Sequence, residues 1–474
     1  MIYYSYFPIM KKIILLIISI TFFSPLWLVG QGYYNQENFG NRSILLSGNV
    51  TGSVDDLGLT YYNPARIALI ENPVFSINAK AFQVKSANIE NVFGRNNKLS
   101  DSRFEGVPSL IAGTFKIEKW ENHHFAYAFL SKQRTRLSLN FSEEIDLDAV
   151  SIDLADVNRF VGDFKLDNKE TDEWFGISWG TKLRDNLSIG VSTFVSIYNY
   201  AAIYDLRFAS EEDISGVGLY NNEINFGQSS YGVFWKLGLA WKLEKVDLGL
   251  NVDFPYLEVY NEGRFRYQQF LSGLDPEDED FQYYDFENLD TKRKEPLGIS
   301  FGMGIPIKKH KLHFKADWHA GLSEYERIVI PAVEDGGESF AFKEELKSVI
   351  NFGLGAEFYL NEGLNLYASV STDFSPIESS ANIFDLVEGD DRDANFDADY
   401  MHYGLGVDIK LKKVKLVVGT TYSTASGDFA EPIEFPNPDI EVPINEDLST
   451  ITVTRWRFIL GLEIPIFGYD LKLK

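Results

Sequence analysis

Four ionisable side chains share the inward face of predicted β-strands and are the best candidates for chemistry in this 474-residue chain: His313, Asp317, His319 and His402. His313 and His319 are six residues apart on one strand, roughly 20 Å by the strand rise, so they cannot act as a pair. No nucleophile can be assigned beside them, and the absence of cysteine excludes thiolate nucleophiles, thiolate zinc sites and disulfides. We therefore interpret them as polar side chains filling an interior, and we expect the protein not to be an enzyme.

Two acidic segments, residues 275–290 and 385–399, raise the question of metal binding. Alternate positions from 391 to 399 carry oxygen ligands at the spacing of a calcium-binding loop. However, Phe396 stands where such a loop requires glycine, and no bidentate glutamate follows at its twelfth position. We interpret both segments as solvated loops, with divalent bridging to surface lipid as a variant, and predict neither a metal site nor a cofactor.

The N-terminus predicts export. Two lysines precede an apolar stretch over residues 13–29, which is followed by Gly30. This is the pattern of a secretory signal peptide over residues 1–31, cleaved in the mature protein, with Met10 as the natural start. The alternative is an uncleaved membrane helix, but the apolar stretch has only about 17 residues and Pro25 interrupts it. The net charge of −25 argues against nucleic-acid binding, because phosphate recognition needs a basic surface.

After the signal, apolar and polar residues alternate with period two, which indicates β-strands. No later apolar stretch is long enough to cross a bilayer as a helix, so a membrane protein would have to be a closed barrel. We predict strands at residues 74–88, 108–119, 123–142, 172–184, 187–208, 228–243, 246–267, 294–306, 310–330, 343–360, 364–375, 399–412, 414–424 and 449–464.

Short turns alternate strictly with long loops between these strands. The turns fall near Trp120, Asp185, Glu244, Lys308, Asn361 and Lys413, and the loops span residues 89–107, 143–171, 209–227, 268–293, 331–342, 376–398 and 425–448. This asymmetry is typical of bacterial outer-membrane barrels, and an even strand count places both termini in the periplasm. We therefore predict an all-β fold, a 14-stranded antiparallel transmembrane β-barrel. A large soluble β-sandwich or propeller is the alternative, but strands of up to about 20 residues exceed the usual length in globular sheets.

Aromatic and small residues add detail to the predicted barrel. Tryptophans near strand ends on the apolar face would form an interfacial girdle: Trp174, Trp235, Trp241, Trp318 and Trp456. The inward face is rich in glycines that leave space for a second segment close to the wall: Gly190, Gly238, Gly249, Gly298, Gly302, Gly304, Gly353, Gly355, Gly404, Gly406 and Gly461. These glycines also permit strand curvature, and the two roles are compatible.

The segment before the first strand, residues 32–73, carries a small-residue run, then acidic residues, then Asn63-Pro64-Ala65 and an apolar continuation. It resembles the N-terminal hatch of the long-chain fatty acid transporter (FadL-type) family of outer-membrane proteins. The departure is Arg66, where that family has glycine. The resemblance implies a hatch at 32–73 inside the lumen of a barrel formed by residues 74–474. Physically, fourteen strands enclose more space than side chains alone can fill, so a plug is expected.

The resemblance implies passive transport of hydrophobic small molecules such as long-chain fatty acids, gated by hatch movement at Asn63, Pro64 and Ala65. Inward side chains that would line the path are Phe194, Phe234, Tyr359, Tyr367 and Ile459, although packing against the plug is the alternative role for them. The other function considered is a platform or assembly component for surface or secreted proteins, with a surface lipoprotein as partner. In either case, outer-membrane lipid and lipopolysaccharide would surround the barrel.

Overall fold

The computed structural model describes residues 33–70, 74–90, 98–117, 119–120, 122–145, 157–212, 217–272, 280–332, 340–379, 398–411, 414–429 and 449–465. The predicted signal peptide, residues 275–279 of the first acidic segment and residues 385–397 of the second lie outside these ranges. No helix within the described ranges is long and apolar enough to cross a membrane.

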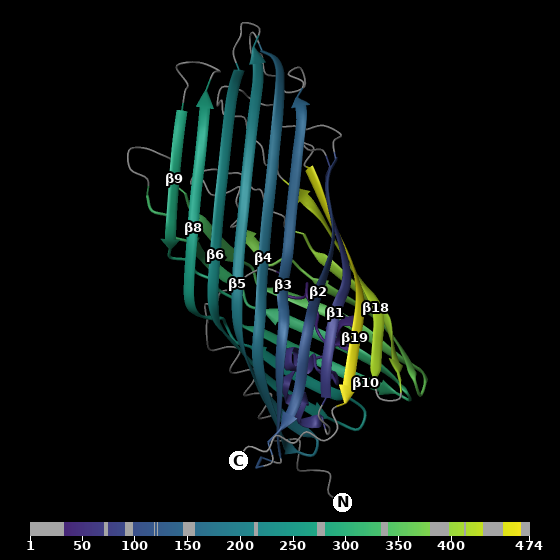
Figure 1. The fold of residues 1–474 in the computed structure, drawn as a ribbon. Helices are drawn as coiled ribbons and strands as arrows, with labels where there is room; N and C mark the ends of the chain where they lie inside the picture. Colours follow the sequence, from purple (N-terminus) through teal and green to yellow (C-terminus); the bar gives the residue numbers. More distant parts are fainter. Residues whose placement is uncertain are drawn as a thin grey trace, which may run out of the picture.

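The chain forms a closed antiparallel barrel of fourteen strands, as predicted (Figure 1). Its strands are β1 (Val74–Glu90), β2 (Lys98–Lys116), β3 (His123–Ile145), β4 (Val157–Arg184), β5 (Leu187–Glu212), β6 (Val217–Lys242), β7 (Asp247–Asp253), β10 (Gly298–Ile307), β11 (His310–His319), β14 (Val349–Asn361), β15 (Leu364–Asp373), β17 (Tyr400–Lys410), β18 (Lys415–Phe429) and β19 (Ser449–Pro465). The ring closes where β1 pairs with both β2 and β19. Val74 faces Pro465 there, so the barrel begins and ends at the same rim.

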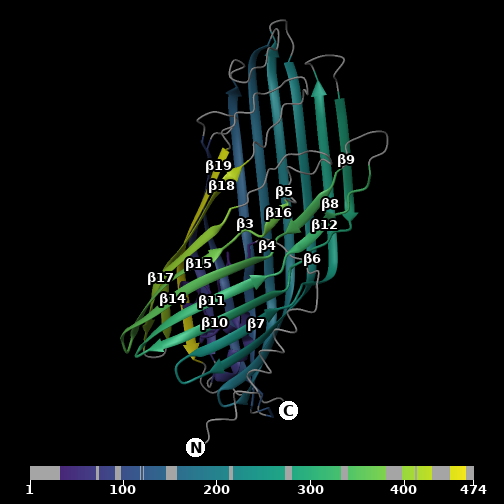
Figure 2. The same cartoon turned by 180° about the vertical axis from the view of Figure 1, so that it is seen from behind.

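One side of the barrel is much taller than the other. β4 has 28 residues and β5 and β6 have 26 each, whereas β10, β11 and β15 have 10 each. Two further strands, β8 (Leu257–Ser272) and β9 (Asp280–Leu289), extend the tall side: β8 pairs with the upper part of β6, and β9 pairs with β8. Figures 1 and 2 show this tall wall standing above the short, tilted strands.

A small second sheet packs inside the tall wall. It contains β12 (Leu322–Ile328), β13 (Phe342–Leu346) and β16 (Ile377–Ser379). Phe342 packs edge-on against Phe226 of β6, with ring centroids 4.5 Å apart. Both rings belong to a buried apolar cluster that fills the upper interior of the tall wall.

Several predicted strand boundaries are wrong. The predicted strand 246–267 is interrupted between β7 and β8, because Pro255 has no N–H to continue the ladder. The predicted strands 310–330 and 343–360 each divide, and one part of each turns into the small sheet. Four of the seven predicted long loops, 89–107, 143–171, 209–227 and 268–293, are mostly strand: β4 starts at Val157, and β9 occupies part of the first acidic segment. The tall wall carries polar residues on its outer face, so it lacks the apolar signal on which the prediction depended.

The predicted aromatic girdle is right in part. Trp241 and Trp456 are exposed on the outer face, and Trp235 and Trp318 are half-buried there. Trp174 is the exception, because it is buried in the lumen. Its neighbour Phe175 takes the outward position, so two adjacent aromatic residues made the strand phase ambiguous at this point.

Residues 33–70 lie inside the barrel and form three short helices, α2 (Arg42–Leu45), α3 (Leu59–Tyr62) and η1 (Pro64–Leu69). We refer to residues 33–70 as the N-terminal segment. Ten of the eleven predicted inward glycines approach it so closely that a Cβ would meet its atoms, and the exception is Gly298, which faces His319 and Asp253. The prediction that these glycines leave room for a second segment is therefore confirmed.

Gly190→Ala is expected to destabilise the barrel by about 1–3 kcal/mol, the usual cost of overpacking. The added Cβ would lie 2.5 Å from the Pro64 carbonyl carbon, and backbone atoms of a packed helix cannot move aside easily. Thermal unfolding and limited proteolysis of the N-terminal segment measure the effect. Gly363→Ala is the matched control, because its nearest neighbour would be 3.6 Å away. Equal stability of the two variants would contradict close packing of the segment against the wall.

Candidate functional site

The N-terminal segment is fastened to the wall by Asn63, the first residue of the predicted gate. Asn63 is extended and caps η1, since its Oδ1 accepts a hydrogen bond from the Ala65 N–H (3.2 Å). Its Nδ2 donates to the carbonyl oxygens of Thr51 (2.8 Å) and of Leu239 in β6 (3.0 Å). Pro64 follows at the first helical position, where its missing N–H costs nothing. Asn63 thus joins the turn at Thr51 and the start of η1 to strand β6 of the barrel.

Pro64 and Ala65 are seated against glycines of the wall. A Cβ at Gly190 or Gly238 would come within 3.0 Å of backbone or ring atoms of these two residues. Arg66, which departs from the resembling family, donates to the carbonyl oxygens of Gly52 (2.9 Å) and Val54. It therefore ties the two halves of the segment together. The structure places the three predicted gate residues side by side at the segment–wall contact.

Charged side chains fasten the segment at two further points. Arg42 forms ion pairs with Glu357 of β14 (3.0 Å) and with Asp55. Glu37 is paired with Arg455 (3.1 Å) and Arg457, both on β19. Removing Glu357 or Glu37 would destabilise the fold, because a buried arginine would then lose its compensating charge, whereas the Asp55 side chain is half exposed. These pairs therefore fix the position of the segment in the lumen.

A buried carboxyl also organises the segment internally. Asp56 accepts hydrogen bonds from the Ser43 N–H and hydroxyl, each 2.8 Å long. Burial raises the pKa of the Asp56 carboxyl, while the Ser43 hydrogen bonds and Arg42 oppose the rise. A Cβ at Gly40, where φ is +91°, would meet this carboxylate, so only glycine fits the turn beside it.

Two of the predicted interior histidines each contact a serine and an acid. His313 Nδ1 lies 2.7 Å from Ser53 Oγ, and its Nε2 lies 3.7 Å from Glu357. His402 Nδ1 lies 2.7 Å from Ser423 Oγ, and its Nε2 lies 3.6 Å from Asp373. Both serines are buried, so a substrate has no approach to them. The first set instead links the N-terminal segment to the wall, as expected for polar filling.

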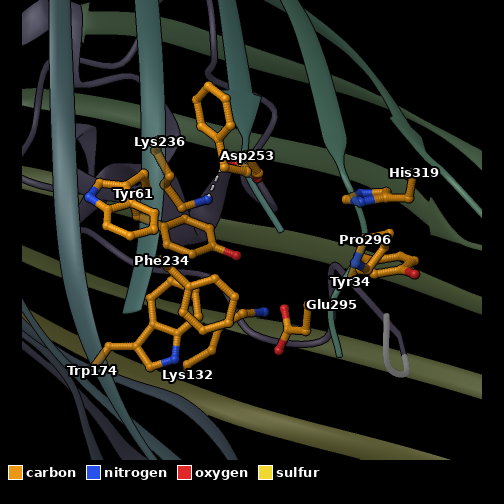
Figure 3. A pocket seen from close by; sticks show the side chains of 12 residues that line it. Tyr34, Tyr61, Lys132, Trp174, Phe234, Lys236, Asp253, Glu295, Pro296 and His319 are labelled. Carbon is orange, nitrogen blue, oxygen red and sulfur yellow. Dashed lines mark ion pairs between the residues drawn. The ribbon is translucent and has the colours of Figure 1, made fainter. Parts of the chain in front are cut away.

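A small cavity lies beside the segment, next to the break between β7 and β8 (Figure 3). It has a volume of about 40 Å³ and is lined by aromatic rings, including Tyr61, Trp174 and Phe234. Trp174 stacks on Phe234 with ring centroids 4.3 Å apart. At the other end Tyr34 stacks on His319 at 3.7 Å. The lining is therefore apolar on several sides, as a site for a hydrophobic molecule requires.

Charged groups of both signs also face the cavity. Lys236 pairs with Asp253 (2.8 Å), and its Nζ lies 4.0 Å from the centre of the Tyr61 ring. Lys132 Nζ lies 5.6 Å from the same ring. Glu295 lines the cavity from the segment that joins β9 to β10, and burial raises the pKa of its carboxyl while Arg293 opposes the rise. The cavity thus combines aromatic faces with two ammonium groups and two carboxyl groups.

A polar layer closes the lumen above the cavity. Arg293 donates to Asp172 (2.7 Å) and Ser196 (2.9 Å), which lie one inward position above Trp174 and Phe194 on β4 and β5. Arg327 of β12 donates to Gln228 (2.8 Å) and to the Tyr198 hydroxyl (2.6 Å). Entry from the tall side therefore requires this layer to move.

The strand ladder of the wall splits beside the cavity, between β2 and β3. Their ladder runs from Lys116↔His124 to Leu110↔Leu130 and ends there. Above this point β2 pairs only with β1, and β3 pairs only with β4, in the part of the chain that the structure describes. A bulge between Ser131 and Gln133 places Lys132 at the foot of the split, from where it reaches the cavity.

The predicted lining residues divide into three groups. Phe234 lines the cavity, and Phe194 belongs to the same aromatic cluster. Tyr367 and Ile459 pack against the N-terminal segment, which was the alternative role proposed for them. Tyr359 is half-buried at the turn end of β14, where Lys309 covers its ring at 4.6 Å, so it lies apart from the others.

Three charged residues of the site were not predicted from the sequence: Lys132, Lys236 and Arg293. Lys236 lies on the inward face of a strand that was predicted correctly, so the alternation of inward and outward residues could have identified it. Lys132 is directed inward by a bulge, and Arg293 lies in a predicted loop, so no periodicity marks either residue. No group of three or more metal-ligating side chains occurs within the described ranges.

No family model and no curated protein matches the sequence. Solved structures match its fold over most of the chain. A Pseudomonas aeruginosa FadL homologue has a TM-score of 0.56 at 12% identity, with 92% of this chain and 99% of that chain covered. The P. putida toluene transporter TodX has a TM-score of 0.58 at 10% identity, with 91% and 100% covered. The resemblance inferred from the sequence is therefore confirmed as a likeness of fold.

Asn63→Asp is expected to loosen the N-terminal segment, because a carboxylate cannot donate to the Thr51 and Leu239 carbonyls. Leaving buried acceptors unsatisfied costs about 1–3 kcal/mol. Hydrogen exchange of the η1 amides should become faster by roughly tenfold or more. In the control Asn361→Asp, the side-chain oxygen that accepts from the Gly363 N–H is retained, so exchange in η1 should not change. Unchanged hydrogen exchange of the η1 amides in both variants would show that Asn63 does not anchor the segment.

Proposed function

We propose that this protein is an outer-membrane channel for the passive passage of hydrophobic small molecules. The observation that carries the proposal is the aromatic cavity at the foot of the split between β2 and β3, with the N-terminal segment beneath it. A molecule in this cavity has a short path sideways through the wall into the membrane. The structural neighbours support the same function, since they include a toluene transporter and a monoaromatic hydrocarbon channel.

The outer surface supports placement in a membrane. Large apolar side chains are exposed around the barrel, among them Phe175, Ile177, Leu237, Leu250, Phe301, Phe352, Leu354, Leu405, Phe458 and Leu460. Above this band the outer face becomes charged, with the pairs Arg134–Glu173 and Arg136–Asp167. Such a band is what an outer-membrane barrel presents to lipid. We place the rim at Val74 and Pro465, and with it both termini, in the periplasm, in accord with the predicted signal peptide.

The proposed cargo is an amphiphile with an apolar chain and a carboxylate, such as a long-chain fatty acid. The aromatic rings of the cavity suit the chain, and the ammonium group of Lys132 suits the carboxylate, because Lys236 is already paired with Asp253. A neutral hydrocarbon would use the rings alone. The effect of Lys132 on uptake would therefore distinguish a fatty acid channel from a channel for aromatic hydrocarbons.

The proposed gate is the N-terminal segment around Asn63, Pro64 and Ala65. The cavity of about 40 Å³ has room for one or two water molecules, whereas a cavity of about 150 Å³ holds benzene. Cargo therefore requires the cavity to widen. The segment forms one side of it through Tyr61, so movement of the segment widens it most directly.

The double variant Ser47→Cys with Ser369→Cys tests gating. The two Oγ atoms, one on the segment and one on β15, are 2.8 Å apart, and the chain has no other cysteine, so a disulfide can lock the segment. We expect oxidised protein in proteoliposomes to take up labelled oleate at least tenfold more slowly, with full recovery on reduction. The single variants serve as controls. Undiminished uptake by the oxidised double variant would rule out gating by this segment.

Lys132→Met tests the cargo class. Loss of a charge-assisted hydrogen bond, about 1.5–3 kcal/mol, should raise the half-saturating oleate concentration about tenfold or more. Toluene uptake should stay unchanged, because its recognition uses the rings alone. Lys182→Met, which changes an exposed lysine on β4, is the control. An equal loss for both compounds would show that Lys132 maintains the cavity rather than recognising a carboxylate.

A platform for surface proteins is the second candidate function. The tall wall favours it, because β4 to β6 exceed the height that a bilayer requires and present a polar outer face. Deletion of the protein distinguishes the two functions: loss of hydrophobic uptake with normal surface display supports the channel. Loss of surface display with normal uptake supports the platform.

A further inference from the structure

A polar hollow lies on the outer face of the tall wall, away from the lumen. Strand register places two neighbouring rows of residues side by side across β4, β5, β6, β8 and β9. The upper row is Lys169, Ala201, Gly227, Arg264 and Glu287, and the lower row is Thr171, Asn199, Ser229 and Glu262. The alternate residues Tyr198, Ala202, Phe226 and Phe265 are buried on the inner side, so both rows face outward.

Residue size creates the hollow. Small side chains at Ala201, Gly227 and Ser229 form its floor, whereas longer side chains on β4 and β8 form its sides. Its volume is about 560 Å³. The Arg264 side chain lies across the floor, because a Cβ at Gly227 would be 3.1 Å from its Nε. Lys169 and Arg264 are three strands apart, about 14 Å by the inter-strand spacing. The hollow is thus long enough for a disaccharide rather than a single ion.

The hollow lies at the upper border of the apolar band. In the next row below, Tyr231 and Tyr260 face each other with ring centroids 5.6 Å apart, as in an interfacial aromatic girdle. Below them on β8, Leu257 and Val259 are 53% and 70% exposed. Lipid chains would remove this apolar surface from water. A molecule in the hollow therefore has its polar part beside charged residues and its apolar part beside exposed side chains.

We propose that this hollow binds the phosphorylated sugar headgroup of an outer-leaflet glycolipid. Lys169 and Arg264 supply cations for phosphate groups, and Arg264 can bind one through two parallel hydrogen bonds. Glu262 and Glu287 supply acceptors for sugar hydroxyls, and Asn199 and Ser229, which hydrogen-bond each other (3.0 Å), supply a donor and further acceptors. The acyl chains then cover Leu257 and Val259. The proposal depends on the membrane placement proposed above, but not on transport.

The test is native mass spectrometry of the full detergent-solubilised barrel with a diphosphorylated glycolipid such as lipid A. The double variant Lys169→Ala with Arg264→Ala should bind it at least tenfold more weakly than the unchanged protein. Dephosphorylated lipid A should bind weakly to both proteins. Inorganic phosphate at the same concentration should not displace the glycolipid, because the acyl chains and sugar contribute to binding.

Two further variants separate the shape of the hollow from the general effect of removing positive charge. Ala201→Leu retains both cations but fills the floor, so it should also weaken binding. Lys242→Ala with Lys245→Ala removes two exposed cations at the β6–β7 turn and should bind as the unchanged protein does. Uptake of oleate should be normal in all of these variants, which separates this site from the channel. Equal glycolipid binding by the Lys169/Arg264 variant, or full displacement by phosphate, would overturn the proposal.

Discussion

The N-terminal segment packs directly against a glycine-lined wall, and this contact determines how the lumen of the barrel is filled. Fourteen strands enclose a lumen that side chains of the wall cannot fill. Glycines bring the wall to the backbone of the segment, and the Asn63 amide satisfies buried carbonyls on both. Leu45 illustrates the packing: it is fully buried, and Cβ atoms at Gly404, Gly406 or Gly419 would meet it. The segment therefore completes the core of the barrel.

The same arrangement explains how a plugged barrel can hold a site. The segment closes the lumen from one side, and the Arg293 and Arg327 layer closes it from the other. Between the two closures, Tyr61 of the segment meets Trp174 and Phe234 of the wall at the foot of the split between β2 and β3. Movement of one element would change the size of the cavity and its access to this split. This coupling is the physical basis for the proposed gated passage.

Periodicity and turn spacing were sufficient to predict the strand count and the short turns, because polar inward and apolar outward residues alternate wherever the outer face of the wall is apolar. The inward glycines also predicted where a second segment must approach. Sequence reasoning failed where the outer face becomes polar, as in β9 and the start of β4, since both faces then carry polar residues. It could not identify Lys132, whose direction depends on a bulge, or Arg293, which enters the lumen from a predicted loop.

Movement of the N-terminal segment during passage of cargo, as proposed, can be measured as a change in its distance from the wall. The cysteine-free chain accepts spin labels at Asp55→Cys, the exposed position of the segment, and at Lys242→Cys on the exposed β6–β7 turn. Pulsed electron resonance then gives the distance between them in lipid bilayers with and without oleate. A segment that moves with cargo should give a longer or broader distance distribution when oleate is present. An unchanged distribution in protein that still takes up oleate would contradict it.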